Sequence, residues 1–232
     1  MLKNKEDVLQ RIEEYKASFI LKGLEPITNY YSFEVDEQEN VYMHTIVKYE
    51  DDIPYRELII PEFVDVMTTP YDEPHGKIQK LIFMGDIEIH GGVFHHFLDL
   101  KTIVFKGNAT LDGSVFAYSN IDEIQFKGKK VYIGDSVFSN AGGNLLLKFY
   151  SNEIKIEGYE SLVGCMTLDF SEANPQLFSV SWRLMEDFES ILIILSDSNI
   201  GLILDEFAKK DEYVIQRVGY NKFLIERQEV LL

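Results

Sequence analysis

Ile103-Val104-Phe105-Lys106-Gly107 is the middle copy of a short motif that occurs three times in the chain. The other copies are Leu81-Ile82-Phe83-Met84-Gly85 and Ile124-Gln125-Phe126-Lys127-Gly128. Each copy is followed about ten residues later by a Val-Phe pair, at Val93-Phe94, Val115-Phe116 and Val137-Phe138, with a spacing of 22 positions. A constant period of this length predicts one short unit of secondary structure stacked on copies of itself, with a continuous core between neighbours.

The pattern extends beyond these copies when the sequence is aligned on the last apolar residue of each predicted strand. These anchors, separated by 21 to 23 residues, are Ile60, Phe83, Phe105, Phe126, Phe149 and Phe170. Two positions before them lie Leu58, Leu81, Ile103, Ile124, Leu147 and Leu168, and three positions earlier lie Tyr55, Ile78, Leu100, Ile121, Asn144 and Cys165. Because side chains alternate along a strand, each anchor and the residue two positions before it are expected to point into the core together.

The unit resembles a leucine-rich repeat of the BspA-like kind, in which Phe is prominent in the strand. The closing phrase of that repeat is best matched by Leu162-Val163-Gly164-Cys165-Met166-Thr167-Leu168, and its first half by Ile133-Gly134-Asp135-Ser136-Val137-Phe138. The similarity covers roughly residues 55–200, where only Cys165 takes the cysteine position and only Pro61 the proline position. The resemblance implies a mainly β fold with some α structure, built as a solenoid of about six coils, and it implies no particular activity.

The flanking segments are expected to cap the two ends of the stack, because a terminal coil otherwise exposes its apolar edge. Residues 1–54 are predicted to hold a helix over 5–22, ended by Gly23, and a β-hairpin over 30–35 and 41–49. The inward positions of that helix are Val8, Leu9, Ile12, Tyr15 and Phe19. Residues 201–232 are predicted to hold a short helix over 201–210, directed inward by Leu204 and Phe207, and a closing hairpin over 213–217 and 222–227.

Charge and composition restrict the classes of function. The chain has 232 residues, 46% of them hydrophobic, with 22 basic and 39 acidic side chains and a formal net charge of −17. Such a charge disfavours direct binding to nucleic acid, and it fits either solubility or steering onto a basic partner. A single cysteine and the lack of a long apolar segment or an apolar leader favour a cytoplasmic protein that does not bind membranes.

Residues with the chemistry for catalysis or metal binding do not form a familiar motif. His90, His95 and His96 are close in sequence, but neighbouring residues of a regular element cannot both point at one metal, so surface turns are the simpler interpretation. Cys165 occupies a core position of the repeat, where cysteine behaves as a small apolar residue. We therefore expect no enzyme activity, no cofactor and no metal, and the oligomeric state is left open.

The outward positions of the predicted strands are the best candidates for a binding site. They form two columns: Glu57, Lys80, Thr102, Glu123, Leu146 and Thr167 in the first, and Ile59, Ile82, Val104, Gln125, Lys148 and Asp169 in the second. Side chains in register on successive strands form ladders, so these twelve are expected to make one surface. Its apolar end at Ile59, Ile82 and Val104 suits a protein interface, or it is covered by the N-terminal helix or hairpin. Tyr118, Tyr132 and Tyr150 are further candidate anchors for a partner.

The sequence thus predicts a non-enzymatic protein-interaction module of bacterial or phage type. An alternative is an acidic inhibitor, such as an immunity protein or a nucleic-acid mimic, that acts on a basic enzyme. A small-molecule or metal enzyme is the third class, because a fold does not determine a function.

Overall fold

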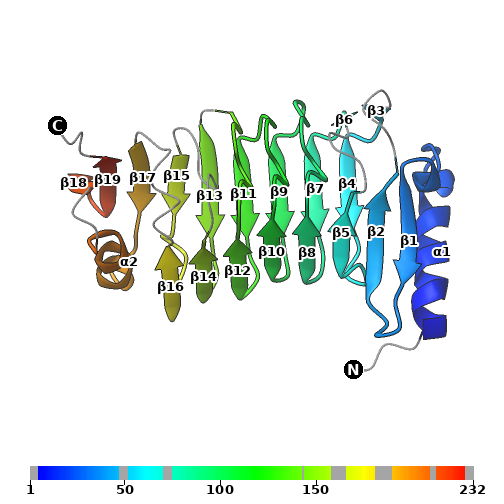
Figure 1. Ribbon diagram of the computed structural model, residues 1–232, viewed down its shortest axis with the longest axis horizontal. Coiled ribbons are helices and arrows are strands. Elements are labelled where there is room, and N and C mark those ends of the chain that lie inside the picture. Colours follow the sequence, from blue (N-terminus) through cyan, green and yellow to red (C-terminus); the bar gives the residue numbers. More distant parts are fainter. Residues whose placement is uncertain are drawn as a thin grey trace.

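The computed structural model describes residues 5–46, 52–69, 75–142, 144–157, 166–180, 190–209 and 213–227. Over these ranges the protein is mainly β with two α-helices, and it forms a β-solenoid of about five turns. The molecule is elongated, with helix α1 (Lys5–Leu21) at one end and helix α2 (Ile200–Phe207) near the other (Figure 1). The prediction of a mainly β solenoid with some α structure is confirmed.

Two sheets run along the solenoid in the described part of the chain. The nine-stranded sheet has the order β18-β19-β17-β15-β13-β11-β9-β7-β4. In chain order its strands are β4 (Glu57–Ile60), β7 (Lys80–Phe83), β9 (Thr102–Phe105), β11 (Glu123–Phe126), β13 (Leu145–Phe149), β15 (Met166–Asp169), β17 (Ser190–Ile194), β18 (Tyr213–Gly219) and β19 (Lys222–Arg227). From β4 to β17 neighbouring strands are parallel, and β19 and β18 close the sheet as an antiparallel hairpin.

The eight-stranded sheet has the order β1-β2-β5-β8-β10-β12-β14-β16. Its strands are β1 (Tyr31–Val35), β2 (Val41–Thr45), β5 (Val66–Thr68), β8 (Ile87–His90), β10 (Ala109–Asp112), β12 (Lys130–Ile133), β14 (Glu153–Ile156) and β16 (Leu177–Val180). A third, two-stranded sheet pairs β3 (Asp52–Ile53) with β6 (His75–Gly76), and a 3-10 turn, η1, spans Ile27–Asn29.

The anchors of the predicted strands lie where the repeat placed them. The anchor set and the set two positions before it are buried from Leu58 and Ile60 through Phe170. In the third set, Asn144 is exposed and Leu145 is buried beside it, whereas Cys165 lies outside the described residues. The second strand of each coil, which builds the eight-stranded sheet, was not predicted. Its signal is the alternation of buried residues in pairs such as Ile87 and Ile89, or Val131 and Ile133.

Stacked phenylalanine rings form the centre of the core. Along the nine-stranded sheet the ring centroids of Phe83, Phe105, Phe126, Phe149 and Phe170 are 4.6, 5.1, 5.2 and 4.7 Å apart, with neighbouring planes within 15° of parallel. A second stack joins the Val-Phe pairs, with centroids 5.6 Å apart from Phe94 to Phe116 and 5.9 Å from Phe116 to Phe138. These distances follow from the roughly 4.8 Å spacing of hydrogen-bonded strands, which places equivalent side chains directly above one another.

The glycine of the repeated motif is required by the contact between successive bends. Gly85, Gly107 and Gly128 occupy the same place in three coils, in the short bend that leads from one sheet to the other. A Cβ atom built on Gly107 would lie 2.2 Å from the backbone carbon of Gly85, and one on Gly128 would lie 2.0 Å from the carbonyl oxygen of Gly107. Only a residue without a side chain allows the backbones to approach so closely.

In three successive coils the opposite corner turns through a residue in the left-handed region. His96, Tyr118 and Asn140 follow the Val-Phe pairs by two positions and have φ values of 59°, 55° and 53°. Their corners are joined by backbone hydrogen bonds, for example from His96 N to Ala117 O at 3.0 Å and from Tyr118 N to Ser139 O at 2.9 Å. The Val-Phe pair therefore marks a corner that buries Phe just before the chain reverses.

The N-terminal end of the stack is closed by α1 and by the β1–β2 hairpin, which extends the eight-stranded sheet. Helix α1 buries Val8, Ile12 and Phe19 as predicted, but Leu9 is exposed because it lies outside the stripe that meets the core. Gly23 ends the helix with a φ of +69°, as its position indicated.

At the C-terminal end, α2 packs against β16, and Phe178 and Phe207 meet with centroids 6.0 Å apart. Ile203 and Phe207 are the buried residues of α2, and Leu204 is only partly buried. The predicted closing hairpin is present as β18 and β19.

Replacement of Gly107 by alanine is expected to destabilise the fold by about 2 kcal/mol or more, because the new methyl group overlaps the backbone of the preceding bend. Gly201→Ala is the matched control, since nothing lies within 4 Å of its Cβ position on α2. That change should stabilise the protein by up to about 1 kcal/mol through helix propensity. Urea unfolding measures both, and equal stabilities for the two variants would contradict the close contact of the bends.

Candidate interaction face of the nine-stranded sheet

The two predicted outward columns lie side by side on the nine-stranded sheet. Strand pairing aligns Glu57, Lys80, Thr102, Glu123, Leu146 and Thr167 in one row, and Ile59, Ile82, Val104, Gln125, Lys148 and Asp169 in the next. We call this surface, together with the third row described below, the sheet face. The structure thus brings the twelve residues of the two predicted columns together on one surface.

Two ion pairs join neighbouring strands, one within the first row and one between the first and second rows. Lys80 Nζ lies 2.8 Å from Glu57 Oε2, and Lys148 Nζ lies 3.0 Å from Glu123 Oε1. Gln125 Nε2 also donates a hydrogen bond of 2.7 Å to Glu123 Oε1. Opposite charges on adjacent strands stabilise a sheet modestly, and here they fix the side chains that a partner would meet.

Glu123 is the carboxylate most strongly held on the sheet face. Partial burial alone would raise its pKa, but the hydrogen bonds from Gln125 and Lys148 and the nearby charges of Lys148 and Lys127 outweigh burial and lower the pKa below its ordinary value. The hydrogen bond to Glu123 correspondingly raises the pKa of Lys148. Both shifts favour the charged forms of the pair at neutral pH.

A third row continues the sheet face at the ends of the strands, and Tyr150 is its one member that was among the predicted residues. Met84, Lys106, Lys127 and Tyr150 follow the anchors directly, and their backbone N–H groups bond to Ile60, Phe83, Phe105 and Phe126 at 2.8–2.9 Å. Met84 is 37% exposed and Tyr150 is 38% exposed. The signal was in the sequence, because these positions lie two residues beyond the second predicted column, on the same side of the strand.

The N-terminal helix meets the edge of the sheet face but does not cover it. Tyr15 Oη donates a hydrogen bond of 2.8 Å to the carbonyl oxygen of Ile59, and Arg11 pairs with Glu62. The Ile59 side chain nevertheless remains 40% exposed, and Ile82 and Val104 remain half-buried. The apolar end of the sheet face is therefore accessible to a partner.

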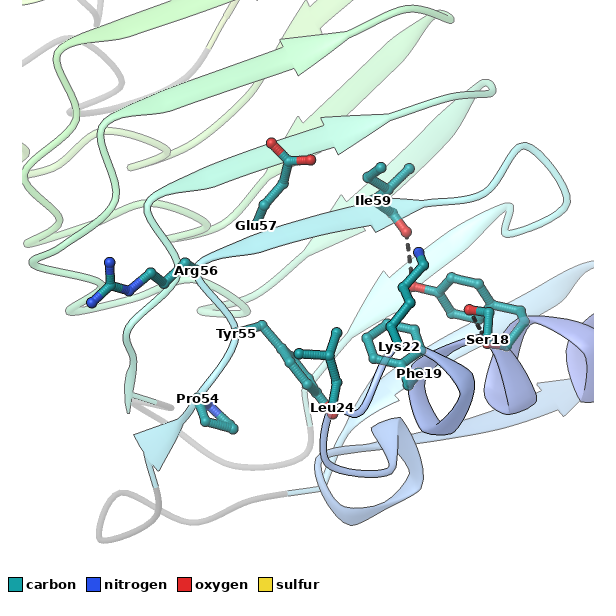
Figure 2. A pocket seen from close by; sticks show the side chains of 10 residues that line it. Ser18, Phe19, Lys22, Leu24, Pro54, Tyr55, Arg56, Glu57 and Ile59 are labelled. Atoms are coloured by element: carbon teal, nitrogen blue, oxygen red, sulfur yellow. Dashed lines mark hydrogen bonds between the residues drawn. The ribbon is translucent and has the colours of Figure 1, made fainter.

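A pocket of about 440 Å³ lies where α1 meets β4, and Figure 2 shows its lining. Phe19, Leu24 and Tyr55 form its apolar wall. Burial raises the pKa of the Tyr55 hydroxyl, which donates a hydrogen bond of 2.9 Å to the Glu25 carbonyl. The two cations at the pocket diverge, because Lys22 extends toward Ile59 and Arg56 points away from the other side chains (Figure 2). With this geometry the Lys22 and Arg56 charges do not point toward a common ligand in the pocket.

The histidines occupy separate places. His95 and His96 lie at a corner with ring centroids 4.3 Å apart, against Tyr118. His44 stacks on Tyr42, and its Nδ1 lies 2.7 Å from Thr68 Oγ1. Of the other tyrosines considered as anchors, Tyr118 is exposed at its corner, whereas Tyr132 is half-buried on the eight-stranded sheet. Among the residues that the structure describes, no three His, Cys, Asp or Glu side chains form a group able to hold a metal ion.

Comparisons of the chain with protein-family models, curated proteins and solved structures find no match. None of the helices in the described ranges has the length and apolarity needed to cross a membrane. The geometry of the sheet face is therefore the basis for a functional proposal.

Glu123→Gln tests whether the Glu123–Lys148 pair holds the sheet face together. We expect a loss of about 0.5–1 kcal/mol in the free energy of unfolding at pH 7. Because the folded pKa of Glu123 is lowered, this contribution is present above its ordinary pKa of 4.5 and is lost as the pH falls through the folded value. Urea unfolding between pH 7 and pH 3 should show the gap between wild type and variant closing with acid. A gap that is independent of pH would contradict the assignment.

Proposed function

We propose that this protein is a non-enzymatic, cytoplasmic interaction module of bacterial or phage type that binds a protein partner through the sheet face. The observation that carries the proposal is the set of outward-facing rows in strand register, with partly exposed apolar residues beside ordered ion pairs. A rigid extended sheet presents such rows without rearrangement, so little conformational entropy is lost on binding. Interfaces of this kind combine an apolar centre with a polar rim.

We also propose that the chain is a leucine-rich repeat protein of the BspA-like kind, with about six coils. This proposal is supported by the phenylalanine-rich strand and by the 21–23-residue period. A repeat origin is compatible with binding, because solenoids present variable residues on a constant frame.

The acidic inhibitor is a second candidate and would use a different surface. Acidic residues Asp36, Glu37 and Glu39 lie at the β1–β2 turn. A nearby pocket of about 280 Å³ on the eight-stranded sheet is lined by Asp65, Asp86 and Glu88, among others. A basic enzyme would meet this region and not the lysine-bearing sheet face.

Substitution of the apolar row tests the leading proposal. Ile82→Thr/Val104→Thr keeps β-branched side chains in the sheet but removes apolar surface, and we expect at least tenfold weaker partner binding. The control is Leu98→Thr/Leu202→Thr, which changes two exposed apolar residues outside the sheet face. The partner is isolated from lysate with wild type, and its affinity for each variant is measured by surface plasmon resonance.

Binding that survives Ile82→Thr/Val104→Thr, but is lost with Glu37→Lys/Glu39→Lys and at high salt, would favour the inhibitor instead. Exposed charge pairs weaken as salt shortens the Debye length, whereas burial of apolar surface does not.

A further inference from the structure

The charge on the sheet face differs from that of the rest of the chain. Across the coils from β4 to β15 its three rows hold four lysines and three carboxylates, whereas the whole protein has 22 basic and 39 acidic residues. The lysines are Lys80, Lys106, Lys127 and Lys148, and the carboxylates are Glu57, Glu123 and Asp169. The acidity of the protein is therefore concentrated away from this surface.

Two of these lysines stand next to each other without a paired carboxylate. Lys106 and Lys127 occupy the same place in adjacent coils, as their N–H bonds to Phe83 and Phe105 show. Both are exposed, and neither forms an ion pair with a described residue; Lys127 lies 5.7 Å over the ring of Tyr150. Lys129, two positions further along the bend, is also exposed. Like charges directly opposite each other destabilise a sheet. The charge of Lys127 also lowers the pKa of nearby Glu123, whereas Lys106 forms no ion pair with a described residue.

An anionic partner relieves this repulsion, and the rest of the molecule restricts its nature. A polyphosphate backbone is repelled at long range by a net charge of −17. A short acidic stretch of a protein carries only local charge and can place apolar side chains beside it. The neighbours of the two lysines fit that chemistry, because Met84 precedes them in the row and Tyr150 follows, and both are exposed.

We propose that the partner of the sheet face contributes an acidic segment with two carboxylates between apolar residues, seated along Met84, Lys106, Lys127 and Tyr150. This inference rests on the proposed function and specifies the chemistry of the partner. The row spans three strand spacings, roughly 14 Å, which an extended peptide covers in about four to five residues. The carboxylates meet Lys106 and Lys127, and the flanking apolar side chains contact Met84 and the Tyr150 ring.

The test is selection of a displayed library of random peptides, each about twelve residues long, on the full chain at low salt. We expect the selected peptides to be enriched in Asp and Glu next to apolar residues. Their affinity should fall roughly tenfold for Lys106→Glu/Lys127→Glu, since two attractions become repulsions. The control Lys5→Glu/Lys209→Glu changes the net charge equally on α1 and after α2, and should leave the affinity unchanged.

The stability of the lysine variants provides an independent measurement. Lys106→Glu alone converts the like-charged neighbours into an opposite pair, so its Tm should equal or exceed that of wild type although peptide binding is weaker. A Tm well below wild type would show that Lys106 has a structural role and would overturn the inference.

The remaining outcomes separate the two proposals. Selected peptides that lack acidic enrichment, but are lost with Ile82→Thr/Val104→Thr, overturn the acidic partner and leave the proposed function in place. If binding of the selected peptides depends neither on Lys106 and Lys127 nor on Ile82 and Val104, both the acidic partner and the proposed function are overturned. Self-association that is abolished by Lys106→Glu/Lys127→Glu, measured by analytical ultracentrifugation, makes a second copy the occupant and overturns a separate partner.

Discussion

The stacking of equivalent residues at the spacing of hydrogen-bonded strands is the constraint on which the rest of this structure depends. It brings Phe83, Phe105 and Phe126 into parallel contact, and at the bends it brings Gly85, Gly107 and Gly128 together so closely that no side chain fits. One geometric condition thus selects a large aromatic residue at one position of the motif and the smallest residue two positions later. It also aligns the outward side chains, and so creates the rows of the sheet face.

How far the sequence could predict the structure depends on where side chains repeat. The strands of the nine-stranded sheet were predictable because Phe and Leu recur there at a fixed period with strand alternation. The second strand of each coil was missed, since its residues change from Ala109 and Leu111 to Val131 and Ile133 without a common motif. Leu9 was placed inward from helical spacing alone, but the direction of α1 over the first coil is set by tertiary packing.

The candidate site was predictable as a set of positions and not as a set of interactions. Because side chains alternate between the two faces of a strand, the twelve outward residues could be assigned to one surface. The in-register pairing of the strands then places them side by side. The pairs of Lys80 with Glu57 and Lys148 with Glu123 depend on rotamers and on neighbouring coils, which spacing does not specify. Met84, Lys106 and Lys127 of the third row were overlooked because they lie in the bends, where strand alternation is harder to follow. The third row nevertheless carries the charges that distinguish this face.

The chain of contacts between coils has a consequence for how such a surface can change in evolution. Each coil joins only its neighbours in both sheets, so an inserted or deleted unit of about 22 residues alters the length of every row by a single side chain. The caps and the existing rows would keep their local environments. The length of the sheet face could therefore change in evolution in steps of one strand spacing. Substitutions at outward positions would change its chemistry independently of its length.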